Sequence, residues 1–202
     1  MTKGTLFIIS APSGAGKTSL VAEILKRVAN IKASVSHTTR ACRPGEQDGV
    51  NYYFVSLALF QKMVKHADFL EHAEVFGNYY GTSEQWVRDT LACGTDVILE
   101  IDWQGAEQTR QQFPNSKSIF ILPPSLQALE ARLNNRGQDN SSVINQRVAA
   151  AKDEMRHYAE ADYLMVNDDF QLALSQLEKI ILGQIDQNSV MVDEDLINNL
   201  LA

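Results

Sequence analysis

The sequence predicts an α/β fold in which a parallel-sheet core is flanked by helices. Short apolar runs alternate with segments whose apolar residues recur at helical spacing, a pattern typical of parallel sheets covered on both faces. A glycine-rich loop follows the first apolar run, where α/β proteins bind phosphate. The stretch 31–94 is too long for an ordinary connection between a strand and a helix, so it predicts an inserted lobe.

Four short apolar runs with polar or turn residues at their ends are the expected core strands. They are Leu6–Ser10, Val97–Ile101, Ile119–Leu122 and Tyr163–Val166. Three later segments have the apolar spacing of amphipathic helices. They are marked by Leu126, Leu129 and Leu133, by Ile144, Val148, Ala151 and Met155, and by Phe170, Leu174, Leu177 and Ile181.

The inserted lobe has its own predicted elements. Ala33–His37 and Tyr52–Val55 are strand-like, and a helix follows that the residues 82–85 would cap and Gly94 would end. A polar segment, Gly137–Ser142, interrupts two helices, as a mobile lid does. The expected boundaries are residues 4–184 for the domain, 4–32 and 95–184 for its core, 33–94 for the lobe, about 137–147 for the lid and 185–202 for a C-terminal tail.

A phosphate-binding loop is predicted between the first strand and the first helix, where residues 10–19 read S-A-P-S-G-A-G-K-T-S. Gly14 and Gly16 allow the backbone to turn so that successive N–H groups converge on one phosphate. Lys17 supplies a positive charge for the outer phosphates, and the Thr18 hydroxyl suits a Mg²⁺ ion bound to them. The dipole of the following helix favours anions at the same place. The loop therefore indicates a protein that binds a nucleoside triphosphate.

Ala11 departs from the pattern, which begins with glycine five residues before Gly16. Its methyl group requires a negative φ but removes no N–H donor. We therefore expect a slightly altered loop that keeps its function.

Length and charge restrict the class of protein. With 202 residues, 45% of them hydrophobic, the chain can bury a core in one domain with a small lobe. Its net charge of −7 disfavours nucleic acid as a partner. Its apolar runs are too short to span a bilayer, and Cys42 and Cys93 form neither a metal-binding spacing nor a disulfide framework. We expect a cytoplasmic protein with no membrane partner.

The arginines gather at two places in this acidic chain, Arg40 with Arg43 and Arg132 with Arg136 and Arg147. Arg132 and Arg136 are four residues apart, so both can point from one helical face into the same cleft. Paired guanidinium hydrogen bonds match phosphate groups. The clusters indicate small, phosphate-rich ligands, whereas solvated surface pairing is the alternative for each arginine taken alone.

A second binding site is predicted inside the lobe. Hydroxyl and guanidinium groups of Ser36, Arg40, Arg43 and Tyr52 match a terminal phosphate better than a sugar or a lipid. Glu71 stands among aromatic and apolar residues, where a carboxylate is costly unless something donates to it. Guanine offers two adjacent donors, N1–H and the 2-amino group, whereas adenine would leave the acid unpaired. The alternative for Glu71, an ordinary acid on a helix surface, stays open from spacing alone.

The run Val97–Asp102 ends a predicted strand in two acids, Glu100 and Asp102, expected on the same face. Beside a phosphate loop, acids at the C-terminal end of a parallel strand usually organise the ligand or the water shell of its metal. Asp102 is therefore a second candidate acceptor for the base.

The motifs together resemble those of the guanylate kinases, P-loop nucleoside monophosphate kinases that phosphorylate GMP from ATP, and the bacterial enzymes most. The resemblance runs in family order from about Gly4 to about Gly183. The matching text is A-P-S-G-A-G-K-T, S-H-T-T-R-x-x-R-P-G-E-x-D-G-x-x-Y-x-F-V, F-L-E-H-A-E-V-F-G-N-Y-Y-G-T, L-E-I-D-W-Q-G-A, I-F-I-L-P-P-S, R-L-x-x-R-G and V-N-D-D.

The resemblance implies transfer of the γ-phosphoryl group of ATP to GMP, with dGMP as a further acceptor, in purine nucleotide metabolism and GMP recycling. GMP would be bound by Ser36, Arg40, Arg43, Tyr52 and Tyr80 at its phosphate and by Glu71, Thr82 and Asp102 at guanine. ATP would be bound by Ala11, Pro12, Ser13, Gly14, Ala15, Gly16, Lys17 and Thr18, with Asn167 and Asp168 near its base. The catalytic cations would be Lys17, Arg43, Arg132, Arg136 and Arg147, and Mg²⁺ would be held at Thr18.

Three positions depart from the family's usual text. Cys42 replaces a common proline, Glu100 a common aspartate, and Thr82 stands where serine is also used. Cys42 puts the stiffness of its loop in doubt, and the longer Glu100 side chain would shift a water bound to magnesium.

Two other functions are alternatives. A guanylate-kinase-like module that binds proteins typically lacks an intact phosphate loop, which is present here, and a kinase for AMP, dTMP or a phosphorylated sugar is disfavoured by Glu71 and Asp102. A structural role without nucleotide fits least. The apolar stripe of the tail 185–202 predicts packing on another subunit or back on the core, and we take the homo-oligomer as the expectation.

Overall fold

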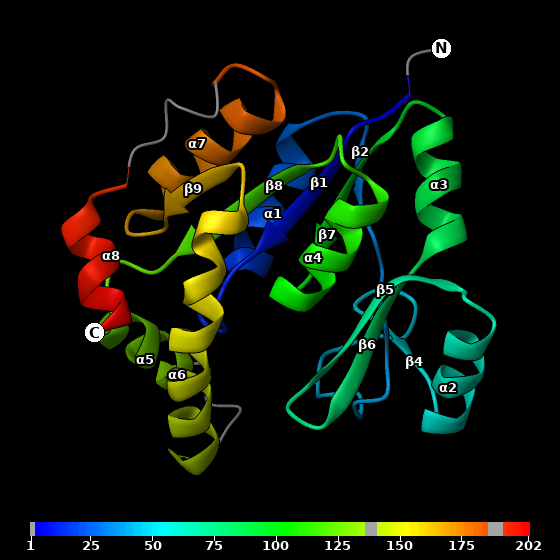
Figure 1. Ribbon diagram of the computed structural model, residues 1–202, viewed down its shortest axis with the longest axis horizontal. Coiled ribbons are helices and arrows are strands. Elements are labelled where there is room, and N and C mark those ends of the chain that lie inside the picture. The colour runs from blue at the N-terminus through cyan, green and yellow to red at the C-terminus, as the bar shows by residue number, and fades with distance from the viewer. Residues whose placement is uncertain (1–2, 136–140, 186–191) are drawn as a thin grey trace. The chain divides into compact units, whose positions relative to one another are not determined.

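The computed structural model describes residues 3–135, 141–185 and 192–202 (Figure 1). The chain forms two compact units. The first unit comprises Met1–Leu6 and Asn30–Ser116, and the second comprises Phe7–Ala29 and Lys117–Ala202. Both contain parallel strands and helices, so the predicted α/β class is confirmed.

The second unit is built on parallel strands. β1 (Leu6–Ser10) pairs with β8 (Lys117–Leu122), which pairs with β9 (Tyr163–Val166). Every residue of β1 is buried, as expected for a parallel strand covered on both faces. The predictions for β1 and β9 are confirmed, and β8 begins earlier than predicted because polar Lys117 and Ser118 continue the pairing.

Helices cover this unit. They are α1 (Lys17–Arg27), α5 (Leu126–Asn135), α6 (Ser141–Met155), the 3₁₀ turn η1 (Arg156–Glu160), α7 (Phe170–Ile181) and α8 (Glu194–Leu201). α1 packs on α7, and α5 packs on α6 through buried Leu129, Leu133 and Ile144. The three helices predicted after residue 125 are thus confirmed. The Arg136 position and 137–140 of the expected lid lie outside the described residues, and 141–147 belong to α6.

The C-terminal helix α8 packs on its own chain. Leu200 is buried in a cluster with Phe120, Leu122 and Met155. The partly buried residues Leu196, Ile197 and Leu201 pack against the same cluster. The apolar stripe that predicted an oligomer is therefore used within the second unit.

The first unit contains a parallel strand pair. β2 (Ile31–Ala33) pairs with β7 (Asp96–Glu100). Asp96 also accepts a hydrogen bond from the N–H of Thr5 at 2.6 Å, which joins the start of the chain to this pair. Two helices belong to the same unit, α3 (Glu84–Ala92) and α4 (Trp103–Gln112). Ser83 caps α3 by accepting from the N–H of Trp86 at 3.4 Å, which confirms the predicted helix start.

A second sheet of four strands completes the first unit. Its order is β4 (Tyr53–Phe54), β3 (His37–Thr38), β6 (Asn78–Ser83) and β5 (Phe69–Val75), and it is accompanied by α2 (Leu57–Lys65). β5 and β6 form an antiparallel hairpin. Phe76 and Gly77 turn it with φ angles of 49° and 73°, since two-residue hairpin loops favour positive φ. The strand ladder shifts between Phe69 and Glu71, and this bulge re-aims the side chains that follow.

Several elements differ from the sequence-based expectations. The expected strand Ala33–His37 is two short strands, because residues 34–36 leave the β2 ladder before β3 begins. The hairpin of β5 and β6 and the helices α2 and α4 were not predicted. The expected strand Val97–Ile101 ends at Glu100. Asp102 lies outside the strand, so the two acids do not share a strand face.

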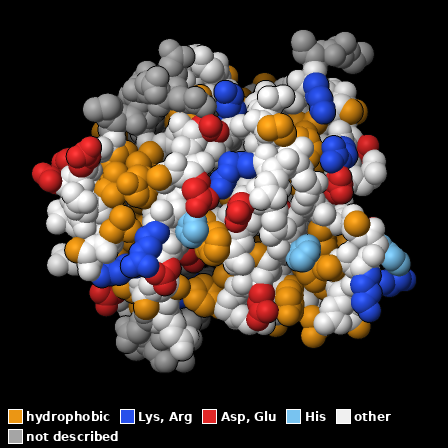
Figure 2. Space-filling view, viewed as in Figure 1, with side chains coloured by type: hydrophobic (Ala, Val, Ile, Leu, Met, Phe, Trp, Pro, Cys, Tyr) orange, Lys and Arg blue, Asp and Glu red, His pale blue; other side chains and the backbone are white. Residues whose placement is uncertain are grey.

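Charges on the surface are mixed. On the face drawn in Figure 2, basic and acidic side chains lie interspersed, and the described residues form no continuous basic patch there. In residues 3–135, 141–185 and 192–202, no helix has the length and apolarity of a membrane span.

Candidate active site

The P-loop of the second unit has the conformation that phosphate binding needs. Gly14 and Gly16 have φ angles of 94° and 96°, which side-chain-bearing residues rarely adopt. Gly16 is also the N-cap of α1, and no side chain of the described residues caps this helix. The first-turn N–H groups are therefore not taken up by a side-chain cap. Ala11 keeps a negative φ, as its methyl group requires.

Asn167 holds this loop in place. It follows β9, is 3% exposed, and donates from Nδ2 to the carbonyl of Ala15 at 2.7 Å. Its own N–H donates to the carbonyl of Leu122 at 2.9 Å, which ties it to β8. A β-carbon on Gly16 would collide with Nδ2 of Asn167, so glycine is required there for packing as well as for φ. We predicted Asn167 near the ATP base, and the structure shows its amide on the P-loop itself.

Two of the predicted arginines lie at this site, one bonded to Asn167 and one to the P-loop itself. Arg132, on α5, donates from Nη2 to the backbone carbonyl of Asn167 at 2.8 Å. Arg147, on α6, donates from Nη1 to the Ser13 hydroxyl at 3.5 Å. Arg132 Nη1 and Asn167 Oδ1 are buried with no hydrogen-bond partner among the described residues. Buried polar atoms are almost always paired, so these two mark a place where a ligand would bind.

Lys17 and Thr18 begin α1. Lys17 is half-buried and Thr18 is exposed. The hydroxyl of Thr18 is a hard oxygen ligand of the type that Mg²⁺ prefers. Thr18 is exposed in the first turn of α1, so its hydroxyl is accessible to a metal ion held mainly by phosphates. Asp168, predicted near the ATP base, is exposed beside Asn167.

In the first unit, Arg40 is held in a defined position. Its guanidinium donates to both carboxylate oxygens of Glu46, from Nη2 at 2.7 Å and from Nη1 at 3.0 Å. The rings of Tyr52 and Phe54 lie 5.3 and 5.7 Å from its carbon Cζ. The hydrogen bond from Arg40 holds the pKa of Glu46 below its usual range. Glu46 also accepts from the backbone N–H of Arg43 at 2.8 Å, so one carboxylate holds the Arg40 guanidinium and the Arg43 backbone.

Two tyrosines predicted at this site also come together. The rings of Tyr52, before β4, and Tyr80, on β6, lie 5.9 Å apart at 64°. Burial raises the pKa of Tyr52, so its hydroxyl stays protonated and able to donate. Ser36, just before β3, lies 3.3 Å from Thr82 between their hydroxyl oxygens. The structure thus brings the predicted polar groups of the lobe to neighbouring strands.

Glu71 lies on β5, and the helix-surface alternative is wrong. Its side chain is 3% exposed and its register partner Thr82 is 1% exposed. A β-carbon at Gly105 would collide with Oε2 of Glu71, so the carboxylate approaches the backbone of α4 closely. A buried carboxylate beside a buried hydroxyl offers acceptors and one donor, a set that can match the N1–H, the 2-amino group and O6 of a guanine ring.

Asp102 has a local structural role. It is the N-cap of α4, and its Oδ1 accepts from the N–H of Gly105 at 2.9 Å while Oδ2 accepts from Gln104 at 3.1 Å. Both carboxylate oxygens thus have a partner on α4. The cap places Gly105 one turn from Asp102 and beside Glu71, so Asp102 supports the position of Glu71 indirectly.

Sequence reasoning missed two residues that shape the site. Gly105 was quoted only as part of a motif, although a glycine inside a helix signals close packing. Glu46 lies six residues from Arg40, a spacing with no pattern that identifies an acid as the partner of an arginine. The loop from 41 to 52 brings the two together, and only the fold supplies that.

The parallel strands, the P-loop held by Asn167 and the cationic side chains around it define a P-loop nucleotide-binding α/β protein. A family model described as guanylate kinase matches residues 3–184. The chain belongs to the guanylate kinase family.

Relatives match over nearly the whole chain. A guanylate kinase of Alcanivorax borkumensis is 58% identical, covering 99% of this chain and 98% of its own. One of Saccharophagus degradans is 62% identical, covering 89% of this chain and 88% of its own. The crystal structure of guanylate kinase from Anaplasma phagocytophilum is 34% identical with a TM-score of 0.77, covering 91% of this chain and 87% of that one.

Proposed function

We propose that this chain transfers the γ-phosphoryl group of ATP to GMP and releases ADP and GDP. The observation that carries the proposal is the buried carboxylate of Glu71 beside Thr82, in a chain whose P-loop is intact. A carboxylate has two acceptor oxygens and can accept a pair of neighbouring N–H groups from a ligand. Guanine supplies two adjacent donors, whereas adenine supplies an acceptor at N1.

The phosphate of GMP is assigned to the polar groups of the lobe. Ser36, Arg40, Arg43, Tyr52 and Tyr80 are its proposed ligands, and Glu71 and Thr82 read the base. Support comes from the fixed geometry of Arg40, whose fork is already oriented by Glu46. A group oriented before binding loses less freedom when the ligand arrives. Asp102, which was predicted to read the base, is proposed to act indirectly through its cap on α4.

ATP is assigned to the P-loop, residues 11–18, with Asn167 and Asp168 toward its base. The fit rests on the buried, unpartnered atoms Arg132 Nη1 and Asn167 Oδ1 among the described residues. Arg132 Nη1 can donate to a phosphate oxygen, and Asn167 Oδ1 can accept from an amino group of the base. Mg²⁺, with Thr18 as its protein ligand, would neutralise phosphate charge when bound.

The reaction needs positioned cations more than a base. The attacking oxygen belongs to the GMP phosphate, whose second pKa of about 6 leaves it largely ionised at neutral pH. Lys17, Arg43, Arg132, Arg136 and Arg147 are the proposed groups that balance charge on the transferring phosphoryl group. A lid over about 137–147 would exclude water when both substrates are bound and suppress hydrolysis of ATP.

A coupled ADP-release assay tests the proposal. With ATP and Mg²⁺ present, GMP, AMP, CMP, UMP, dTMP and dGMP are compared as acceptors. Turnover with GMP, and with dGMP at a lower rate, is the expected result. Turnover with another base alone would keep the kinase and overturn the guanine site. Tight ATP binding without turnover for any acceptor would favour the protein-binding module instead.

Three features of the chain stay predictions. They are the lobe boundary at 33–94, a cytoplasmic location and a homo-oligomer formed through 185–202. The packing of α8 on the core of its own unit bears on the homo-oligomer. Analytical ultracentrifugation at micromolar concentration tests whether the protein is a monomer or an oligomer. A monomer would show that the tail serves only the chain's own core.

A further inference from the structure

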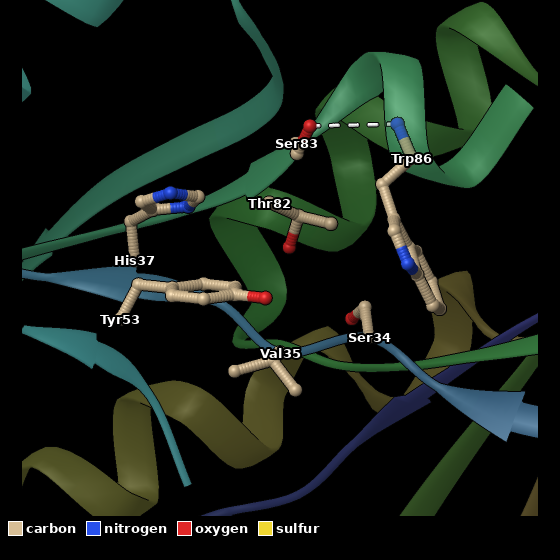
Figure 3. A pocket seen from close by; sticks show the side chains of 7 residues that line it. All are labelled: Ser34, Val35, His37, Tyr53, Thr82, Ser83 and Trp86. Atoms are coloured by element: carbon tan, nitrogen blue, oxygen red, sulfur yellow. Dashed lines mark hydrogen bonds between the residues drawn. The ribbon is translucent and has the colours of Figure 1, made fainter. Parts of the chain in front are cut away.

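A pocket of about 250 Å³ opens in the first unit, at one end of the four-stranded sheet (Figure 3). Three aromatic side chains and three hydroxyl-bearing side chains form most of its wall. They are His37, Tyr53 and Trp86, and Ser34, Thr82 and Ser83. Only Thr82 belongs to the ligand-binding residues proposed above.

The aromatic wall lies on the opposite face of the sheet from the phosphate ligands. Neighbouring residues in a strand point to opposite faces. On β4, Phe54 packs against the guanidinium of Arg40, whereas Tyr53 stacks on His37 with ring centroids 4.8 Å apart at 29°. On β3, Thr38 accepts from the N–H of Arg40, whereas His37 faces Tyr53. His37 and Tyr53 therefore lie on the other face of the sheet from the phosphate ligands, and the pocket meets the proposed GMP site only at Thr82.

The chemistry of the wall selects an uncharged ligand. Hydroxyl, phenol and indole groups carry no charge at neutral pH, and burial lowers the pKa of His37, which keeps its imidazole neutral. No arginine, lysine or carboxylate is among the lining residues. A phosphate group in this pocket would therefore have no positive side chain to pair with. A neutral molecule needs no such partner.

The orientation of the polar groups points to a planar molecule with acceptors. Figure 3 shows the Tyr53 ring and the Trp86 indole on two sides of the pocket, with the hydroxyl oxygens of Tyr53, Thr82 and Ser34 directed between them. Ser34 Oγ is buried and has no hydrogen-bond partner among the described residues. A ligand acceptor would satisfy this hydroxyl. The Tyr53 ring stacks on His37 and presents its hydroxyl edge to the pocket, so the indole of Trp86 is the flat surface on which an aromatic ligand can stack.

We propose that this pocket binds an uncharged planar heterocycle of the size of a nucleobase. The ring would stack on Trp86, and acceptors on it would take hydrogen bonds from the hydroxyls of Ser34 and Tyr53. The volume of about 250 Å³ lies below the range of about 300–1,000 Å³ of sites for larger organic ligands, so it suits a ligand smaller than a complete nucleotide. Thr82, which contacts Ser36 in the guanine-reading group, links the pocket to that group.

Caffeine is the probe for this site. It is neutral and planar and has carbonyl acceptors, but its methyl groups remove the N–H donors that Glu71 would require, so it cannot imitate guanine. Titration is followed by tryptophan fluorescence, with a Kd on the order of 1 mM or below expected for a ligand of this size. Trp103→Phe removes the chain's other tryptophan, and the Trp86 signal and the Kd should persist.

Variants in the wall locate the binding. Ser34→Val removes the hydroxyl, and Trp86→Leu, at a partly exposed position with 36% exposure, removes one stacking face without disturbing the core. Each should raise the Kd for caffeine at least tenfold and leave kcat with GMP within twofold. Phosphoryl transfer assayed on the same samples shows that the variants are folded, and it reports on the proposed function separately.

Competition with GMP completes the test. Binding that persists at saturating GMP and is lost in both variants supports the pocket. The proposal is overturned if caffeine does not bind at 10-fold the expected Kd, if GMP displaces it competitively, or if both variants bind it as the unmodified chain does.

Discussion

The carboxylate of Glu71 occupies the space that a side chain at position 105 would need. Oε2 of Glu71 lies closer to an ideal β-carbon on Gly105 than any real contact allows, and Ile101 restricts the same space from another side. Glu71 is 3% exposed on β5, and Gly105 is buried in the first turn of α4. The buried acid is therefore positioned by the absence of a side chain at residue 105.

Gly105→Ala tests this relationship. The new methyl group has to displace the Glu71 carboxylate, so kcat/KM for GMP should fall on the order of 10²-fold, the effect of about 1 Å of misplacement. The KM for ATP should hardly change. Steady-state kinetics with each substrate varied measures both. Glu107→Ala, an exposed change on the same helix, is the control, and an equal loss there would contradict the role of Gly105.

Glu46→Ala tests the orientation of Arg40. The change removes two hydrogen bonds to the guanidinium and one from the N–H of Arg43. Because hydrogen bonds to charged groups contribute about 1.5–3 kcal/mol each, the KM for GMP should rise at least tenfold. Glu84→Ala breaks a comparable but exposed pair with Arg88, and its effect should be small. Similar kinetics in the two variants would show that the Glu46 pair has no special role.

Asn167→Asp tests the contact with the P-loop. The substitution keeps the shape but replaces the donor to the Ala15 carbonyl with a second acceptor. Repulsion should displace the loop and raise the KM for ATP at least tenfold, with a smaller effect on the KM for GMP. Isothermal titration with a non-hydrolysable ATP analogue measures the binding directly. Asn199→Asp, on the exposed side of α8, serves as the control for the added charge. Unchanged affinity in Asn167→Asp would remove the residue from the site.

His37→Gln tests the pH dependence of stability. Burial lowers the pKa of His37 below 6.5, although Gly81, Asp48 and Asp68 oppose the shift. The unfolded chain then binds this proton more readily than the folded chain. The contribution to stability is fully present above pH 6.5 and is lost as the pH falls from there toward the folded pKa.

The expected result is a smaller loss of thermal stability on acidification in His37→Gln than in the unmodified chain. Thermal unfolding between pH 7.5 and 5 measures it. His66→Gln, at an exposed histidine, should keep the original pH dependence. Parallel curves for all three chains would mean that His37 titrates alike in the folded and unfolded states.

Arg43→Met and Arg136→Met test the proposed phosphoryl-stabilising cations. Each substitution removes a guanidinium but keeps most of the side-chain length, so turnover should fall by orders of magnitude while circular dichroism and the melting temperature stay close to those of the unmodified chain. Lys26→Met removes an exposed charge on α1 as a control. Near-normal kcat in both arginine variants would overturn their catalytic assignment.

Part of the fold and site was predictable because it depends on local patterns. The strands β1, β8 and β9, the P-loop and the helix capped by Ser83 follow from apolar runs, glycines and capping residues close together in the chain. The hairpin of β5 and β6 was missed because Phe69–Thr82 mixes polar with apolar residues. In that stretch Glu71 suggested a function, but the order of polar and apolar residues did not alternate regularly enough to predict strands.

By itself, the sequence determined the α/β class, the triphosphate loop and the types of side chain available for a second phosphate and a base. These features depend on residue identity and on spacings between residues that are close together in the sequence. Only the tertiary structure decided that Glu71 is buried against Gly105, that Glu46 orients Arg40, that Asn167 holds the P-loop, and that α8 covers its own core. Each of these pairs distant or unpatterned residues, and such contacts form only when burial of the core brings their strands and helices together.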